Sequence, residues 1–300
     1  MRYSFLALIF SVILAEPYHI DNNFVSKRFL VYYAHFTAPS SALIVVPETE
    51  IEKLTHSKIY HIRTRIVIET VFLIDKSIIA SATDIKKTQD DLDKAVEVFS
   101  GVTIKFDVVQ ISYIQFSSRD FVDCWIDALN YQDCLSIYYV FCHPQDTYVG
   151  LSSPPWIDFP YGIILAKSSN DYCCAHEIGH YFGLFHSFQN GPDGDYVDDT
   201  PCQETIYIAS SQPSSQKLDL LKSNKPTVSD NQCPVENGPN CRNLMNYCDH
   251  SGRRFITDGQ KMRMRWFLEK YRQNNIIPST ELKQIEDLKI AASQAMSEQP

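Results

Sequence analysis

The stretch HEIGHYFGLFH, residues 176–186, has the most informative spacing in this 300-residue chain. His176 and His180 are four residues apart, so on an α-helix both rings project from one face, one turn apart, and both can reach a single metal ion. Glu177 sits beside them but off that face, where it can act on a water at the metal instead of ligating the metal. The stretch therefore predicts a helix that carries two metal ligands and a candidate general base.

Gly183 and His186 extend the pattern beyond the helix. A glycine can adopt the positive φ that lets a chain leave a helix in a sharp turn, and such a turn would bring His186 round to the same ion. Three neutral imidazoles leave one position of a tetrahedral zinc site open, as catalytic zinc sites do, whereas structural sites usually have four protein ligands. We therefore expect a catalytic zinc on three histidines, and the alternative is an amphipathic helix that simply buries them.

A second motif, NLMNY at residues 243–247, follows about sixty residues downstream. The pattern HExxHxxGxxH followed by a methionine-containing turn is the metzincin signature. Met245 would form an apolar floor under the zinc site. Tyr247 could swing its phenol toward the metal and stabilise a developing oxyanion. The order of the two motifs favours these functional readings over simple packing.

Four blocks of the sequence resemble the pappalysin-type metzincins, which are secreted zinc metalloendopeptidases related to ulilysin and pregnancy-associated plasma protein A. The blocks are HEIGHYFGLFHSF (176–188), DGDYVDDTPCQ (193–203), CRNLMNYCD (241–249) and FITDGQKMRMR (255–265). The resemblance implies an α+β, metzincin-like zincin fold. In that fold an N-terminal mixed twisted sheet with covering helices and an irregular C-terminal subdomain flank a horizontal active-site cleft.

The resemblance also implies roles for individual residues. It makes His176, His180 and His186 the zinc ligands, Glu177 the general base and acid, Met245 the methionine of the Met-turn and Tyr247 the tyrosine on the oxyanion side. The run YGIILA, residues 161–166, would be the edge strand above the cleft that pairs with an extended substrate. A calcium site is implied at Asp193, Asp195, Asp198, Asp199 and Thr200, since clustered oxygen atoms suit Ca²⁺; a solvated acidic loop is the alternative.

The N-terminus predicts export from the cell. Residues 1–15 place Arg2 before a short apolar run and a small residue, which is the organisation of a secretory signal peptide. We divide the rest into a pro-segment or N-terminal extension (16–58), a metalloendopeptidase catalytic domain (59–278) and a C-terminal tail (279–300). The protein is therefore expected to be extracellular, without a membrane anchor.

All nine cysteines lie between residues 124 and 248, at positions 124, 134, 142, 173, 174, 202, 233, 241 and 248. In a secreted protein most of them are expected to form disulfides, and an odd number leaves at least one otherwise engaged. Cys202 with Cys233 or Cys241, and Cys248 with one of the remainder, are plausible pairs near residues 243–247, but the sequence does not choose between these partners.

Charge and hydrophobic patterning bound the remaining possibilities. The chain has 27 Lys and Arg residues against 36 Asp and Glu residues, a formal net charge of −9. This charge gives no electrostatic basis for sequence-independent binding to nucleic acid. We interpret the basic run at 253–266 as a solvated helix face rather than an anion-binding patch. Strands are predicted at 65–74, 102–114, 135–142 and 161–166, and helices at 83–100 and 257–274.

The sequence thus predicts a secreted zinc-dependent metalloendopeptidase that acts on protein or peptide substrates. Zinc is the expected cofactor, with calcium as a possible second ion, and the oligomeric state is not specified by any pattern. A catalytically inactive, secreted zinc-containing binding or decoy module is the alternative. It is disfavoured because a structural zinc site has no need of Glu177. A nucleophilic hydrolase is weaker still, since the chain contains no GxSxG motif.

Overall fold

The computed structural model describes about half of the chain. The described residues are 45–47, 49, 58–69, 71–72, 78–79, 82–114, 124, 127–128, 130–141, 149–156, 162–169, 172–187, 195–200, 242–246 and 255–287. The predicted signal peptide (1–15) and most of the predicted pro-segment (16–58) lie outside them. Within this part of the chain, no helix combines the length and apolar character needed to cross a membrane.

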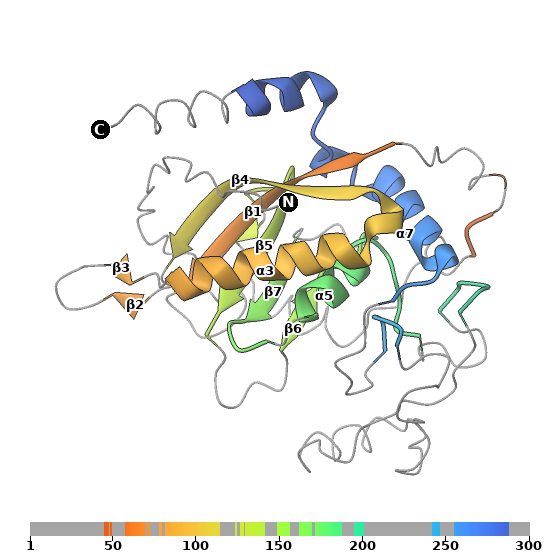
Figure 1. The fold of residues 1–300 in the computed structure, drawn as a ribbon, viewed down its shortest axis with the longest axis horizontal. Helices are drawn as coiled ribbons and strands as arrows, with labels where there is room; N and C mark the ends of the chain where they lie inside the picture. Colours follow the sequence, from red (N-terminus) through yellow and green to blue (C-terminus); the bar gives the residue numbers. More distant parts are fainter. Residues whose placement is uncertain are drawn as a thin grey trace, which may run out of the picture.

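The centre of the fold is a five-stranded mixed sheet with strand order β4-β1-β5-β7-β6 (Figure 1). The first four strands in this order run parallel, and β6 pairs antiparallel with β7 at the edge. The strands are β1 (Tyr60–Glu69), β4 (Ile104–Ile114), β5 (Leu135–Val140), β6 (Gly150–Ser152) and β7 (Gly162–Ala166). A separate two-stranded ribbon consists of β2 (Val71–Phe72) and β3 (Ile78–Ile79).

The three central strands are buried on both faces, as expected for parallel strands covered by other elements. Successive residues alternate between two apolar clusters because side chains on a strand point to opposite faces. On β5, Ile137 and Tyr139 belong to the main core, whereas Tyr138 and Val140 belong to a second, smaller cluster. The sheet therefore has a core on each side.

Two helices cover the main-core face. They are α3 (Ala82–Val98) and α5 (Cys173–Tyr181), which lie side by side in front of the strands (Figure 1). Leu92 and Ala95 of α3 and Ile178 of α5 are buried in the same cluster as the sheet residues. This packing fixes α5, the helix that carries the HExxH motif, against the sheet.

The strand expected at the sheet edge is not the edge strand. The sequence prediction gave that place to 161–166, but β7 (Gly162–Ala166) has β5 on one side and β6 on the other. The short β6 comes just before β7 in the chain and folds back antiparallel to it, because a nearby preceding segment can pair directly in this way. Among the described residues, β6 therefore forms the edge next to α5.

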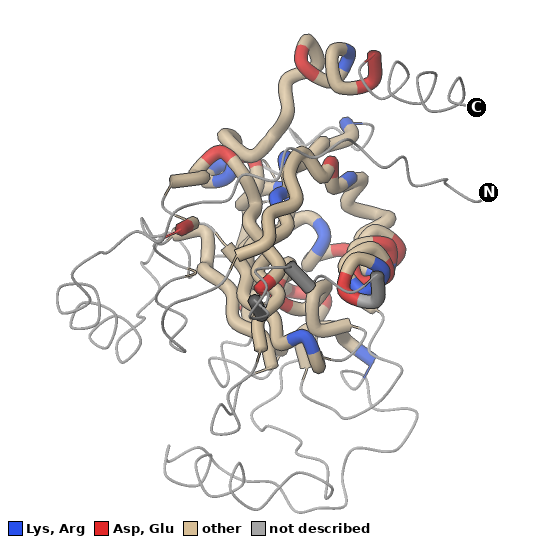
Figure 2. Tube along the Cα trace, turned by 90° about the vertical axis from the view of Figure 1, so that its left-hand side faces the viewer, with Lys and Arg blue, Asp and Glu red and all other residues tan. Residues whose placement is uncertain are grey.

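The helix α7 (Asp258–Tyr271) begins with a capping box in which the side chains of Thr257 and Gln260 each accept from the other's backbone N–H. It was predicted to present a solvated basic face, and this is wrong for two of its arginines: Arg263 and Arg265 are buried. Their guanidinium groups lie over aromatic rings, which explains how two cations are accommodated in the interior. Elsewhere, Lys and Arg residues are interspersed with Asp and Glu residues along the described chain (Figure 2).

Beyond α7 the chain returns to the sheet through a short 3-10 helix, η3 (Gln273–Asn275). Ile276 forms a bridge with Ile62, and the Ile277 N–H donates to the carbonyl of His61 at 2.8 Å. Residues 279–287 are helical. Arg63 donates two hydrogen bonds, of 2.6 and 2.7 Å, to the carboxylate of Glu281 in that helix.

Candidate metal centre

The helix α5 positions the first two histidines. It is buried along most of its length, and His176 and His180 project from it one turn apart, with ring centroids 4.7 Å from each other. Because the opposite side of the helix packs into the main core through Ile178, the histidine face is directed away from the sheet. The local spacing and the packing therefore act together to present both imidazoles at one place.

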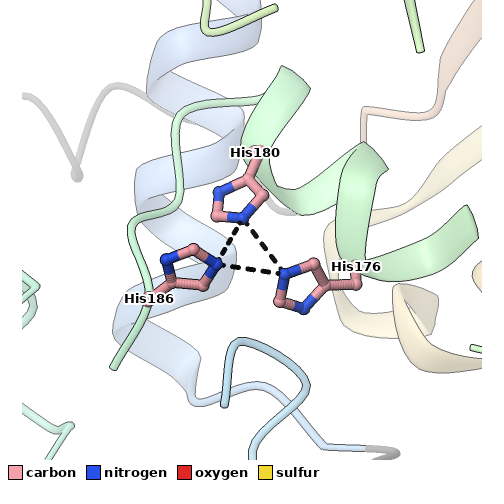
Figure 3. A group of neighbouring side chains, drawn as sticks. All are labelled: His176, His180 and His186. Atoms are coloured by element: carbon pink, nitrogen blue, oxygen red, sulfur yellow. Dashed lines mark hydrogen bonds between the residues drawn. The ribbon is translucent and has the colours of Figure 1, made fainter. Parts of the chain in front are cut away.

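The turn after α5 delivers the third histidine. Gly183 has φ +92°, its N–H donates to the carbonyl of His180, and the Leu184 N–H donates to that of Gly179. These two bonds form the Schellman motif, which ends a helix at a residue in the left-handed region. The predicted positive φ at Gly183 is confirmed. The reversal places His186 opposite the helix, facing the other two rings (Figure 3).

The three Nε2 atoms converge on one point (Figure 3). Their separations are 3.1 Å between His176 and His180, 3.0 Å between His180 and His186, and 3.3 Å between His176 and His186. Three nitrogens bound tetrahedrally to one zinc ion at its usual bond length would be about 3.3 Å apart. The observed triangle is thus close to the size that one such ion requires.

Hydrogen bonds on the far side of two rings fix which nitrogen faces the centre. His176 Nδ1 donates to the carbonyl of Leu244 and His180 Nδ1 to that of Leu184, both at 2.8 Å. Burial lowers the pKa of His180 to about 4, so its ring is neutral near pH 7. A neutral ring that donates from Nδ1 presents a lone pair at Nε2. Nδ1 of both rings is engaged by a carbonyl, so the two Nε2 atoms, 3.1 Å apart, are left to face the centre, and this donor set fits a metal ion.

The Met-turn lies directly beneath this cluster. Met245 is fully buried, and its sulfur lies so close to Gly179 of α5 that a Cβ on that glycine would be 2.6 Å from it. The carbonyl of Met245 accepts from the N–H of Ser187, the residue after His186. Met245 thus packs against the helix that carries two of the histidines, and its role as the floor of a zinc site stays a prediction. Tyr247, predicted to act on the oxyanion side, lies outside the described residues.

Glu177 is buried beside the edge of the sheet. A Cβ on Gly150, the first residue of β6, would be 2.7 Å from Glu177 Oε1, so the carboxylate lies directly against the edge strand. No described residue donates a hydrogen bond to it, and burial raises the pKa of Glu177 to about 8. A divalent cation nearby would lower this pKa again by favouring the carboxylate form. Sequence reasoning missed Gly150, because a single glycine before a three-residue strand gives no signal of a site.

The described part of the acidic loop, residues 195–200, does not form a recognisable cation site. Within the described ranges, the three histidines are the only cluster of His, Cys, Asp or Glu ligand atoms close enough to hold a metal. Asp195 instead accepts from the Gln260 side chain and Asp199 from the backbone N–H of Gly259, both in α7. Asp193 lies outside the described residues. The calcium prediction is therefore without support here.

Only some of the cysteines lie among the described residues, and these are buried. Cys134 and Cys174 are buried free thiols, so neither contributes to the disulfides expected from the sequence. Cys173 is also buried, and its thiol donates a long contact of 3.6 Å to the carbonyl of Val149, next to Glu177. The other cysteines for which pairing was considered, Cys202, Cys233, Cys241 and Cys248, lie outside the described residues, as does Cys142.

Comparison with known proteins gives a consistent result for the second half of the chain. Residues 161–269 match the peptidase family described as pregnancy-associated plasma protein-A. Extracellular metalloproteases of Sordaria macrospora and Neurospora crassa are each 37% identical over 102 residues, which cover 33% of this chain and 30% of theirs. The matched region thus spans less than a third of the length of these relatives. The resemblance to pappalysin-type metzincins predicted from the sequence is confirmed for this segment, which is similar to metallopeptidases.

A further extracellular metalloprotease, from Podospora anserina, is 34% identical over 121 residues, covering 38% of this chain and 36% of its own. Among solved structures, mirolysin in complex with a compound is 16% identical, with a TM-score of 0.45 over 74% of this chain and all of that one.

Proposed function

We propose that this chain is a secreted zinc-dependent metalloendopeptidase in which His176, His180 and His186 hold the zinc and Glu177 is the general base. One observation carries the proposal: three imidazole Nε2 nitrogens converge at close to the separation that a single tetrahedral zinc ion requires. The similarity of residues 161–269 to extracellular metalloproteases supports the same reading.

A zinc ion held by His176, His180 and His186 would supply Lewis-acid chemistry toward the scissile carbonyl and the attacking water. Glu177 removes a proton from that water and then delivers it to the leaving amine. Its carboxylate is suited to this exchange because it is buried and no described residue donates a hydrogen bond to it. Tyr247 stabilises the oxyanion of the tetrahedral intermediate with its phenol.

The substrate lies in extended form along the outer edge of β6. Val149 and Ser153 bond to β7 through Ala166 and Gly162, so in an antiparallel ladder the backbone groups of the alternate residues, Gly150 and Ser152, point away from it. A peptide can add to these groups as a further strand. Gly150 also lies against Glu177, so a main chain docked at this edge would run next to the proposed general base.

Export through a signal peptide at residues 1–15 completes the proposal. The N-terminal pattern and the extracellular relatives support it. N-terminal sequencing of protein collected from the medium of a eukaryotic expression host tests it. A first residue near Glu16 or further along is expected, whereas retention of Met1 would contradict it.

Glu177→Gln is the decisive variant for the catalytic assignment, because it keeps the shape of the side chain and removes the base. We expect one zinc per chain in both proteins and a fall of about 10²- to 10⁴-fold in kcat on casein for the variant. Wild-type cleavage should stop with 1,10-phenanthroline. Zinc binding without any proteolysis by the wild-type protein would instead favour the inactive binding or decoy module, and equal activity of the two proteins would remove Glu177 from the mechanism.

A further inference from the structure

We propose that Gln260, a residue of α7 that is not a metal ligand, positions His176 and His186 through the Met-turn and so sets the affinity of the site for zinc. The inference rests on the proposed zinc site and adds a positioning residue to it. It is built from a continuous chain of hydrogen bonds among buried groups, described link by link below.

Gln260 is the hub of a buried polar network at the start of α7. Its Oε1 accepts from the N–H of Thr257 at 3.0 Å and from Asn243 Nδ2 at 2.8 Å. Its Nε2 donates to Asn243 Oδ1 and to Asp195 Oδ2, both at 3.3 Å. Gln260 is completely buried and Asn243 and Asp195 nearly so, so none of these polar groups can exchange its partner for water without the fold opening.

Asn243 links Gln260 to the Met-turn. Its Oδ1 accepts from the N–H of Met245 at 2.9 Å, and its carbonyl accepts from the N–H of Asn246. Leu244 is tied from outside the turn, since its N–H donates to the carbonyl of Phe255 at 2.7 Å. The side chain of Asn243 is therefore held by Gln260 on one side and holds the turn backbone on the other.

The Met-turn also forms hydrogen bonds with two of the three segments that carry the histidines. The Leu244 carbonyl accepts from His176 Nδ1 at 2.8 Å, and the Met245 carbonyl accepts from the N–H of Ser187 at 3.0 Å. Ser187 directly follows His186. A displacement of the turn would therefore misdirect His176 and His186 together, whereas His180 is held by the Schellman turn and would stay in place.

Loss of the Gln260 network should weaken metal binding, because partners that orient metal-ligating histidines typically account for 10- to 100-fold in metal affinity. Gln260→Glu is the sharpest perturbation. It retains the Oε1 acceptor for Thr257 and Asn243 but replaces the donor with an oxygen that faces Asp195 Oδ2 and Asn243 Oδ1. Two acceptors then face each other in a buried site, which is costly.

Asp195→Asn provides the matching rescue. In the double variant, the amide introduced at position 195 can donate to the carboxylate introduced at position 260, which restores the complementarity of that contact with the roles reversed. As a single change, Asp195→Asn keeps an oxygen that accepts from Gln260 and should bind zinc like the wild type. Leu268→Ala, a fully buried position about two turns further along the same helix, is the control for general loss of stability.

The experiment measures zinc dissociation constants of the full-length chain by competition with a chromophoric chelator, together with the absorption spectrum of the Co²⁺-substituted protein. We expect Gln260→Glu to raise the zinc dissociation constant 10- to 100-fold and to alter the Co²⁺ ligand-field bands. The double variant should return to within about threefold of the wild type. Leu268→Ala should melt at a lower temperature with unchanged zinc affinity. Gln260→Asn, which keeps the amide and shortens its reach, should act in the same direction as Gln260→Glu if the latter folds poorly.

Unchanged zinc affinity in both Gln260 variants would overturn the inference, as would a double variant no better than Gln260→Glu. These failures differ from failure of the proposed function, which would show as absence of stoichiometric zinc binding or of proteolysis in the wild-type protein itself.

Discussion

Replacement of Gly183 by alanine tests how the third histidine reaches the metal. Gly183 has φ +92°, and a Cβ at this position would be 2.5 Å from Cγ and 2.7 Å from Cδ2 of Phe267. The alanine therefore faces two separate penalties, one in its own backbone and one against the ring of a fully buried phenylalanine.

The two penalties set the size of the effect. The left-handed conformation costs an L-residue roughly 1–2 kcal/mol, and overpacking a well-packed core costs roughly 1–3 kcal/mol. We therefore expect Gly183→Ala to lower the free energy of unfolding by roughly 2–5 kcal/mol. If the chain escapes the strain by changing the turn, His186 moves, and the zinc dissociation constant should rise as well.

Urea denaturation of the zinc-loaded and the EDTA-treated protein measures both effects. Gly101→Ala is the matched control, since its φ is not in the left-handed region and the three atoms nearest to its new Cβ all belong to the flexible side chain of Lys261. A Gly183→Ala protein as stable and as tightly zinc-bound as Gly101→Ala would refute the reasoning.

Three further outcomes are expected. Gly150→Ala should reduce kcat about 10- to 100-fold with zinc content unchanged, because its Cβ would displace the Glu177 carboxylate; steady-state kinetics with metal analysis checks this. Burial raises the pKa of Asp195 from 3.8 to about 6, so the folded state binds this proton more tightly than the unfolded state. The Asp195 carboxyl therefore contributes its full stabilisation below about pH 4, and the free energy of unfolding falls by about 3 kcal/mol as the pH rises to about 6. Urea denaturation of Asp195→Asn over the same pH range should not show this fall. Zinc at about 1,000 times its dissociation constant should stabilise the folded protein by about 4 kcal/mol. Removal of zinc with EDTA should therefore lower the melting temperature by the corresponding amount, and zinc but not magnesium should restore it.

The spacing of residues in the sequence predicted those parts of the site that depend only on the local conformation of the backbone. The interval between His176 and His180 fixes their common face once the segment is helical, and the need for a positive φ singles out Gly183. Four of the five strands of the central sheet were also predicted, because each contains a run of apolar or β-branched residues. Strand β1 begins at Tyr60, five residues before the predicted start, since polar residues His61 and Arg63 interrupt its apolar pattern.

Features that depend on distant contacts were not predictable in the same way. The three residues of β6 are too few to show a period, so the edge strand was assigned to β7. Arg263 and Arg265 look like solvent-facing charges until the aromatic rings beneath them are known. Gln260 could be read as a capping-box residue from the T-x-x-Q pattern, but its bond to Asn243 joins segments 17 residues apart and is visible only in three dimensions.

Extended X-ray absorption fine structure at the zinc K edge tests the central claim most directly, since it counts and identifies the atoms bound to the metal. For the zinc-loaded wild-type protein we predict three imidazole nitrogens and one further oxygen or nitrogen at about 2.0–2.1 Å. A sulfur scatterer at about 2.3 Å, or fewer than three imidazoles, would contradict the three-histidine site and the catalytic role built on it.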